Sequence, residues 1–409
     1  MSFSFNFAGD DISDTEIEDT TTNLARTTIS SLSQSQATPA PSLIPAQCHN
    51  LPSLLATLPS QLTYNYLTIP SHHSISTLQS KTGTKTTNDS IHTRVPRRSL
   101  FDIRQQLMAE SDPSDTTDST NTLLEGLESG DLSNGVYEGG FKTWECAVDL
   151  ADYISSHLDN LDALDEGTDI HVIELGAGSA IPSLVLLRDV LQQRRTTVQS
   201  KDVQQSNGTT RQGQRGKVKF TFCDYNADVL RLCTAANVLL TTATLALGDE
   251  QTAAAGNNEN EEDIDVDERV VAECLRRLGE ADVEVDFISG AWGDEFTKLV
   301  RAGMARASGA AEERVARKKI LVLASETIYA PESLGVFART VGDFLAMGDE
   351  TEEVDVSVYV AAKKVYFGVG GGVAEFEEEI RKLGCRTEMV LDVKDAGVGR
   401  VVLEVKVGT

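Results

Sequence analysis

The sequence predicts an α/β fold, in which a mostly parallel sheet is covered by helices on both faces. After Gly135, short apolar runs alternate with longer segments of helical periodicity, which is typical of parallel strands joined by crossover helices. One apolar run, 169–175, also ends in a glycine turn that opens an apolar helix. Such a turn lets a ligand approach the backbone closely, because glycine has no Cβ.

The expected elements follow in chain order. Strands are expected at 169–175, 217–225, 284–292, 318–326 and 354–364, with a closing pair near 386–393 and 400–407. Helices are expected at 141–158, 181–194, 227–243, 331–348 and 372–384. Pro182 falls in the first turn of its helix, where proline is tolerated. Polar segments at 193–216 and 248–268 are expected to be loop insertions, and the second lacks the ligand spacing of a calcium-binding loop.

The chain before this region has a different character. Residues 1–94 are rich in Ser and Thr and offer little periodic apolar surface, so we expect them to be mostly disordered. Within 95–134, helical spacing of Leu100, Ile103, Leu107 and Met108 predicts a short docking helix, followed by a polar linker. Residues 135–409 then form one domain of catalytic size.

Composition narrows the class of protein. The chain has 36 Lys+Arg and 63 Asp+Glu, and its net charge of −27 argues against nonspecific attraction to nucleic acid and favours a basic partner. Its 6 cysteines include no C-x-x-C pair, and its 6 histidines show no ligand spacing, so we expect reduced thiols and no metal. With no targeting or membrane-spanning pattern, we expect a cytoplasmic and nuclear monomer that binds no membrane and no specific nucleic-acid sequence.

The glycine turn after the 169–175 strand admits two classes of cofactor. A dinucleotide fingerprint needs a third glycine and an acidic residue about twenty positions later, but Ile181 and a distant Asp224 stand here instead. Glu174, Gly176 and Gly178 fit better the E-x-G-x-G turn of methyltransferases that use the cationic cofactor S-adenosylmethionine. A turn required only by tight strand–helix packing is the alternative.

Other candidate residues fall at the carboxyl ends of predicted strands, where open α/β sheets bind ligands. Asp224 is placed to accept both ribose hydroxyls, or else to cap a helix. Trp292 is placed to stack on an adenine, or else belongs to the core. Glu326 also falls at the carboxyl end of a predicted strand, where it is placed to contact a ligand, or else stabilises a helix N-terminus.

The ordered motifs of the chain resemble those of the histidine protein methyltransferases, which modify a histidine of a large-subunit ribosomal protein. The motifs are GVYEGGFKTWECAVDL, ELGAGSAIP, DYN, SGAW, ASETIY and YFGVGGGV, and the resemblance covers about residues 95–409. The first and last motifs separate this branch from the related protein lysine methyltransferases. The resemblance implies a class I (Rossmann-like) methyltransferase fold with a seven-strand sheet, S-adenosylmethionine as cofactor and a basic ribosomal protein as substrate.

The resemblance also implies the residues of the cofactor site. They are Thr143, Trp144, Glu145, Cys146, Ala147, Gly176, Asp224, Tyr225, Asn226, Gly290, Ala291, Trp292 and Ser325, to which the turn itself adds Glu174 and Gly178. The polar insertions and the long N-terminal region depart from a compact family member, and they leave the approach of the substrate open.

The chemistry of the acceptor suggests roles for two further residues. Imidazole, with an unperturbed pKa of about 6.5, is mostly neutral at cellular pH, so its methylation requires no strong general base. We expect Glu326 to accept the N–H of the nonreacting ring nitrogen and Tyr329 to shape the pocket. The glycine-rich 366–373 segment lacks the G-K-[ST] of a phosphate loop and is expected to be a turn beside the substrate. A lysine methyltransferase of the same fold and a non-catalytic ribosome-assembly adaptor remain alternatives.

Overall fold

The structure, a computed structural model of the 409-residue chain, describes several ranges of the sequence, all within the unit Ser42–Thr409. The described ranges are 43–70, 92–112, 119–129, 139–157, 167–204, 216–247, 261–307, 317–350, 353–368, 370–394 and 397–408. None of the helices in these ranges combines the length and the apolar content needed to cross a bilayer.

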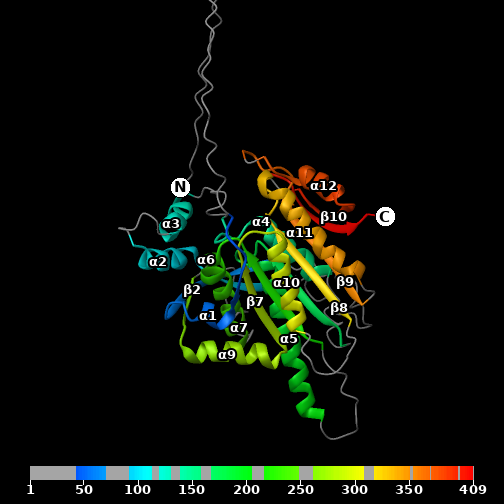
Figure 1. The fold of residues 1–409 in the computed structure, drawn as a ribbon. Coiled ribbons are helices and arrows are strands. Elements are labelled where there is room, and N and C mark those ends of the chain that lie inside the picture. The colour runs from blue at the N-terminus through cyan, green and yellow to red at the C-terminus, as the bar shows by residue number, and fades with distance from the viewer. Residues whose placement is uncertain are drawn as a thin grey trace, which may run out of the picture. The chain divides into compact units, whose positions relative to one another are not determined.

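An eight-stranded sheet in the order β1-β7-β5-β4-β8-β9-β11-β10 forms the centre of this unit (Figure 1). Its strands are β1 (Gln47–Asn50), β4 (Asp169–Leu175), β5 (Val218–Asp224), β7 (Val283–Ser289), β8 (Lys318–Ser325), β9 (Val354–Lys363), β10 (Cys385–Val393) and β11 (Arg400–Val407). The run from β7 to β9 is parallel, whereas β1, β11 and β10 pair antiparallel. The predicted class I fold with a mostly parallel seven-strand sheet is confirmed, and β1 adds an eighth strand at one edge.

Helices cover both faces of the sheet, as the alternating pattern predicts. One face packs against α4 (Glu145–His157), α5 (Ile181–Gln204), α7 (Ala235–Leu247) and α9 (Glu268–Glu280). The other packs against α10 (Asp294–Ala307), α11 (Pro331–Glu350) and α12 (Val373–Lys382). Successive residues of β4 serve the two cores in turn, because side chains alternate across a strand: Val172 lies in the first and Ile173 in the second.

The prediction that residues 1–94 are mostly disordered is wrong for part of this region, which forms strands of a second, three-stranded sheet. This sheet consists of β3 (His92–Arg98), β2 (Gln61–Pro70) and β6 (Glu262–Asp265), and α1 (Leu51–Leu55) precedes it. In β2, Leu62 and Tyr64 are buried while Thr63 between them bonds to Asp263, a period-two pattern that the Ser/Thr-rich composition hides. Residues 1–42 and 71–91 lie outside the described residues.

The expected loop insertions are also partly regular structure. The first continues as helix α5 as far as Gln204, and 205–215 lie outside the described residues. The second includes β6, whose acidic side chains pair with polar groups of β2: Asp263 accepts from Thr63 and Glu262 from Tyr64. These cross-strand partners explain why a run of carboxylates forms a strand here.

The predicted docking helix is present as α2 (Leu100–Glu110), with a further helix, α3 (Ser119–Ser129), in the expected linker. Ile103 and Leu107 are buried against α3 and the 229–233 segment. Leu100 and Met108, however, are 38% and 50% exposed, so half of the expected apolar stripe faces outward. The helix therefore contacts the domain through one narrow face, which carries Ile103 and Leu107.

The expected helix 227–243 is broken into three parts. It begins as α6 (Ala227–Val229), continues as the π-helix η2 (Leu230–Thr234) and ends as α7. A π-turn is wider than an α-turn, and π-turns within α-helices often occur at functional sites. Here the π-helix lies directly after Asp224 and Asn226, at the carboxyl edge of the sheet.

Candidate functional site

A tight turn at the end of β4 occupies the carboxyl edge of the central strands. Gly176 and Gly178 have φ of 66° and 50°, in the left-handed region that favours glycine. A Cβ on Gly178 would lie 2.8 Å from the carbonyl oxygen of Gly140, and a Cβ on Gly176 would lie 2.8 Å from Thr327 Cγ2. Close packing therefore requires both glycines, whatever ligand the turn holds.

Asp224, at the end of β5, ties this turn to the neighbouring strand. Its Oδ2 accepts from the backbone N–H of Gly178 at 3.0 Å, and its Oδ1 accepts from the N–H of Asn226 at 3.1 Å. Each carboxylate oxygen can accept more than one hydrogen bond, so these contacts are compatible with ribose hydroxyls as further donors. The alternative that Asp224 caps a helix is wrong, because Asn226 occupies the N-cap position of α6 and its side chain makes no capping bond.

Glu174, the penultimate residue of β4, is buried directly before the glycine turn. Its Oε2 accepts from the N–H of Ser183 in the first turn of α5 at 3.1 Å, and its Oε1 has no hydrogen-bond partner. Burial raises the pKa of this carboxyl to about 8, although the bonds from Ser183 act in the opposite direction. Glu174 thus supports the turn from inside the domain.

The segment before α4 lies against the turn. The hydroxyls of Thr143 and Ser179 are 3.0 Å apart, and the indole N–H of Trp144 donates to the carbonyl of Gly139 at 3.1 Å. Cys146 and Ala147 are buried in the first turn of α4. Burial raises the pKa of the Cys146 thiol, and the nearby Glu326 raises it further, so the thiol stays neutral.

The predicted residues after β7 divide between the site and the core. The N–H of Gly290 donates to the carbonyls of Asp224 and Tyr225 at 3.0 and 3.1 Å. The N–H of Ala291 donates to Ile44, so the segment preceding β1 covers this turn. Trp292 packs on Phe337 of α11, with ring centroids 4.9 Å apart, which favours its role in the core.

A second polar cluster surrounds Glu326, next to β8. Glu326 has a φ of 56°, a strained conformation for a residue with a side chain and one that is often found at functional sites. The Tyr366 hydroxyl donates to Glu326 Oε2 at 2.5 Å, while the buried Oε1 has no hydrogen-bond partner. Burial and the adjacent Glu326 raise the pKa of Tyr366, which keeps the phenol protonated as a donor. Ser325, half-buried, precedes this carboxylate.

Lys363 connects this cluster to the segment before α4. Its Nζ lies 3.2 Å from Glu145 Oε2, 3.7 Å from Glu326 Oε1 and 5.3 Å from the centroid of the Trp144 ring. Burial lowers the pKa of Lys363, but Glu326 and Glu145 outweigh it and the net shift is upward. The ammonium therefore remains charged beside the two carboxylates.

The glycine-rich segment after β9 packs directly on Tyr329. The N–H of Gly371 donates to the carbonyl of Tyr329 at 3.0 Å, and a Cβ on Gly371 would lie 2.4 Å from that same oxygen. The rings of Tyr329 and Tyr366 meet edge to face with centroids 6.2 Å apart. Tyr366 is the residue that sequence reasoning missed. Its motif was recognised, but the pairing with Glu326 depends on β8 and β9 being neighbours.

Polar atoms without partners gather at this same edge of the sheet. Besides Glu174 Oε1 and Glu326 Oε1, the buried Asn226 Nδ2 and Thr327 Oγ1 have no hydrogen-bond partner. A buried polar group without a partner costs free energy, about 1–3 kcal/mol each. Their concentration beside the glycine turn indicates a site that a polar ligand completes. Nowhere in the described ranges do three His, Cys, Asp or Glu side chains gather as metal ligands do.

Comparison with known proteins identifies the family. Histidine protein methyltransferase 1 of Saccharomyces cerevisiae is 36% identical over 288 residues, which span 69% of this chain and 67% of that protein. Its counterpart from Schizosaccharomyces pombe is 32% identical over 292 residues, spanning 71% and 70%. The chain belongs to the histidine protein methyltransferase 1 family. No family model matches the chain.

Two solved structures that resemble this family member share little sequence with it. The carbon methyltransferase DszA is 12% identical with a TM-score of 0.30, and the match covers 75% of this chain and 70% of that one. The rRNA methyltransferase aviRa from Streptomyces viridochromogenes is 13% identical with a TM-score of 0.29, covering 71% and 96%. The fold assignment rests on the strand order described above.

As a member of this family, the chain is an S-adenosylmethionine-dependent methyltransferase, and its residues fit that cofactor. Asn226 Nδ2 and Glu174 Oε1 are buried without hydrogen-bond partners, and a Cβ would fit at neither Gly176 nor Gly178 of the turn. The Asp224 carboxylate suits ribose hydroxyls. Glu174 contributes a buried oxygen, Oε1, that has no hydrogen-bond partner. The turn 176–178, Asp224 and Asn226 would hold the nucleoside, and the Thr143–Ala147 segment would close the site from the other side.

Proposed function

We propose that the chain methylates a histidine imidazole in a large-subunit ribosomal protein. The observation that carries the proposal is the state of the two Glu326 oxygens. Oε2 is held by the Tyr366 hydroxyl at 2.5 Å, whereas the buried Oε1 has no hydrogen-bond partner. A neutral imidazole offers one N–H and one lone pair, and a carboxylate oxygen that accepts no hydrogen bond matches the N–H.

In the proposed reaction the protein orients the ring rather than deprotonates it. The cofactor supplies the methyl group, activated by its sulfonium. Glu326 Oε1 accepts the N–H of one ring nitrogen, which fixes the tautomer and leaves a lone pair on the other nitrogen. Tyr366 restricts rotation of the carboxylate, and the Lys363 ammonium lies 3.7 Å from its Oε1. The ring of Tyr329 lies beside that of Tyr366 and borders the proposed acceptor pocket. Methyl transfer needs the attacking nitrogen about 3–3.5 Å from the methyl carbon, and this pocket would hold it there.

The charge of the chain supports a basic substrate. A net charge of −27 attracts a basic protein and repels bare phosphate backbone, so the acceptor is better presented by a ribosomal protein than by RNA. The proposal places the enzyme in the cytoplasm and the nucleus.

Labelling locates the acceptor. The full chain is incubated with isotope-labelled S-adenosylmethionine and purified large-subunit ribosomal proteins, and the label is then mapped by mass spectrometry. The proposal predicts label on a single histidine, and none when that histidine is replaced by alanine. Label on a lysine would instead assign a lysine methyltransferase, and tight cofactor binding without any transfer would indicate an adaptor.

A further inference from the structure

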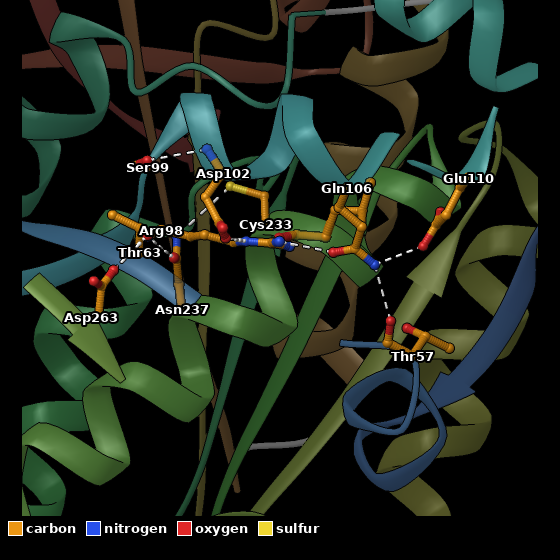
Figure 2. A network of polar contacts seen from close by, with 11 residues as sticks. Thr57, Thr63, Arg98, Ser99, Asp102, Gln106, Glu110, Cys233, Asn237 and Asp263 are labelled. Atoms are coloured by element: carbon orange, nitrogen blue, oxygen red, sulfur yellow. Dashed lines mark hydrogen bonds and ion pairs between the residues drawn. The ribbon is translucent and has the colours of Figure 1, made fainter. Parts of the chain in front are cut away.

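A buried arginine joins the N-terminal docking segment to the region around the glycine turn. The side chain of Arg98, the last residue of β3, is 0% exposed. Its Nε donates to Asp102 Oδ2 at 2.5 Å and its Nη2 to Gln106 Oε1 at 2.8 Å. Figure 2 shows Asp102 and Gln106 pointing from α2 toward the guanidinium. The arginine thereby fixes α2 to the domain.

The same arginine also donates a hydrogen bond to the π-helix. Its Nη1 donates to the carbonyl of Leu232 in η2 at 2.9 Å. Two residues further along, the Thr234 hydroxyl donates to the carbonyl of Gly178 at 2.7 Å. A π-turn replaces the regular i→i−4 bonds with i→i−5 bonds. Arg98 adds a side-chain donor to one carbonyl of this π-helix, and Thr234 of the same helix holds the glycine turn.

A second route runs through Asn237, which is fully buried in α7. The backbone N–H of Arg98 donates to Asn237 Oδ1 at 2.7 Å, and Asn237 Nδ2 donates to the carbonyl of Ser179 at 3.0 Å. Gly178 and Ser179 are therefore each separated from Arg98 by a short chain of hydrogen bonds. Connected networks of this kind lose more than one bond when a member is removed.

Apolar packing joins the docking segment to the other half of the cofactor motif. The buried Ile103 and Leu107 of α2 share a cluster with Phe141 and Val229. A Cβ on Gly140 would lie 2.8 Å from Val229 Cγ1 and 3.4 Å from Asp224 Oδ2. Both segments that face the cofactor, the glycine turn and the Gly140–Thr143 stretch, thus rest on structure that α2 holds.

We propose that Arg98 is a positioning residue for S-adenosylmethionine, through which docking of the 92–110 segment sets the shape of the glycine turn. A purely structural arginine would stabilise the fold without changing cofactor affinity. If Arg98 positions the turn, cofactor affinity depends on it, and by thermodynamic reciprocity bound cofactor stabilises α2. The proposal rests on the cofactor occupying the turn, and it is independent of the identity of the methyl acceptor.

The first test measures the dissociation constant of S-adenosylhomocysteine by calorimetry, without any acceptor. Arg98→Gln should weaken binding about tenfold, a coupling of about 1.4 kcal/mol. The matched control is Lys219→Gln, which also removes a buried cation paired with a carboxylate, Asp286, at 2.5 Å. Lys219 lies near the start of β5, at the opposite end of that strand from Asp224. The control should lower the melting temperature and leave the dissociation constant within twofold of wild type. A folded Arg98→Gln variant with wild-type affinity, or equal weakening in both variants, overturns the proposal.

The second test needs no variant and decides the matter even if Arg98→Gln fails to fold. Hydrogen exchange of the wild-type chain is followed with and without saturating S-adenosylhomocysteine. The amides of α2 should exchange several-fold more slowly with the ligand, and those of β10, at the far edge of the sheet, should change less. Unchanged exchange in α2, or equal slowing in α2 and β10, overturns the proposal.

Discussion

The two halves of the proposed site, one for the cofactor and one for the methyl acceptor, are built in different ways. The cofactor half, at the ends of β4 and β5, consists largely of backbone groups fixed by buried carboxylates: Asp224 alone accepts the N–H groups of Gly178 and Asn226. The acceptor half consists of side chains from separate segments. Glu326 directly follows β8, Lys363 ends β9, and Tyr366 lies in the loop after β9. The cofactor half is thus formed mainly by fixed backbone, and the acceptor half by polar and charged side chains in defined orientations.

This difference predicts a separation of functions. A backbone surface fixed by carboxylates contributes mainly to holding the cofactor, so damage to it should appear in binding. The Glu326 carboxylate, with Oε2 held by Tyr366 and Oε1 accepting no hydrogen bond, contributes mainly by orienting the acceptor. Its loss should therefore lower kcat. The following changes test that separation.

The largest expected effect is on the acceptor side. Glu326→Ala removes the oxygen that accepts the imidazole N–H, and a hydrogen bond to a charged group is worth about 1.5–3 kcal/mol. We expect kcat to fall by about 10- to 150-fold, and less in Glu326→Gln, which can still accept a hydrogen bond. The dissociation constant of the cofactor should change little. A loss of cofactor affinity as large as the loss of turnover would contradict the separation.

A similar or smaller loss is expected on the cofactor side, but in affinity. Asp224→Asn cannot accept at both oxygens, so one of the bonds from Gly178 and Asn226 is lost together with the negative charge. Cofactor binding should weaken by about 1–3 kcal/mol, as measured by calorimetry, while kcat at saturating cofactor stays near wild type. Unchanged affinity would remove Asp224 from the site.

Glu174 gives the cofactor half a pH-dependent stability. Its pKa is raised by burial from 4.5 to about 8, so between these values the folded protein holds a proton that the unfolded chain releases. The free energy of unfolding should therefore fall as pH rises through this window, on the order of a few kcal/mol in total. Glu174→Gln keeps an acceptor for Ser183 and should flatten the profile, which denaturant titrations from pH 5 to 8.5 would measure. Parallel profiles for the two proteins would refute the assignment.

The smallest effect is expected from Tyr366→Phe. This change removes the hydroxyl that holds Glu326 Oε2 at 2.5 Å but keeps the ring beside Tyr329. Tyr366 acts on the acceptor only through Glu326, so we expect a loss of about 1 kcal/mol, which corresponds to a roughly fivefold lower kcat with cofactor affinity unchanged. Tyr329→Phe is the matched control. It keeps its ring too, and it should impair mainly the KM for the protein substrate. Equal losses of kcat in both variants would show that Tyr366 has no particular role.

The sequence predicts the cofactor half better than the acceptor half, for a physical reason. Strand 169–175 and its turn are encoded in one continuous stretch, and the structure reproduces the strand bounds. Tyr366 and Lys363 act on Glu326 only because β9 pairs with β8, which no local pattern specifies. The β2 strand was missed for another reason: its buried Leu62 and Tyr64 alternate with polar residues that pair across the sheet. Composition alone makes such a stretch resemble a linker.

The most direct test of the account is the pH dependence of methyl transfer. The central claim is that a neutral imidazole, oriented by Glu326, attacks without a general base. Initial rates would be measured from pH 5.5 to 9.5 at saturating cofactor, on a ribosomal-protein substrate and on its version with the target histidine replaced by alanine. The account predicts a rate that rises through roughly pH 6–7, as imidazole loses its proton, and then stays level, with no transfer to the alanine version. A rate that continues to climb above pH 8, or equal labelling of both substrates, would contradict it.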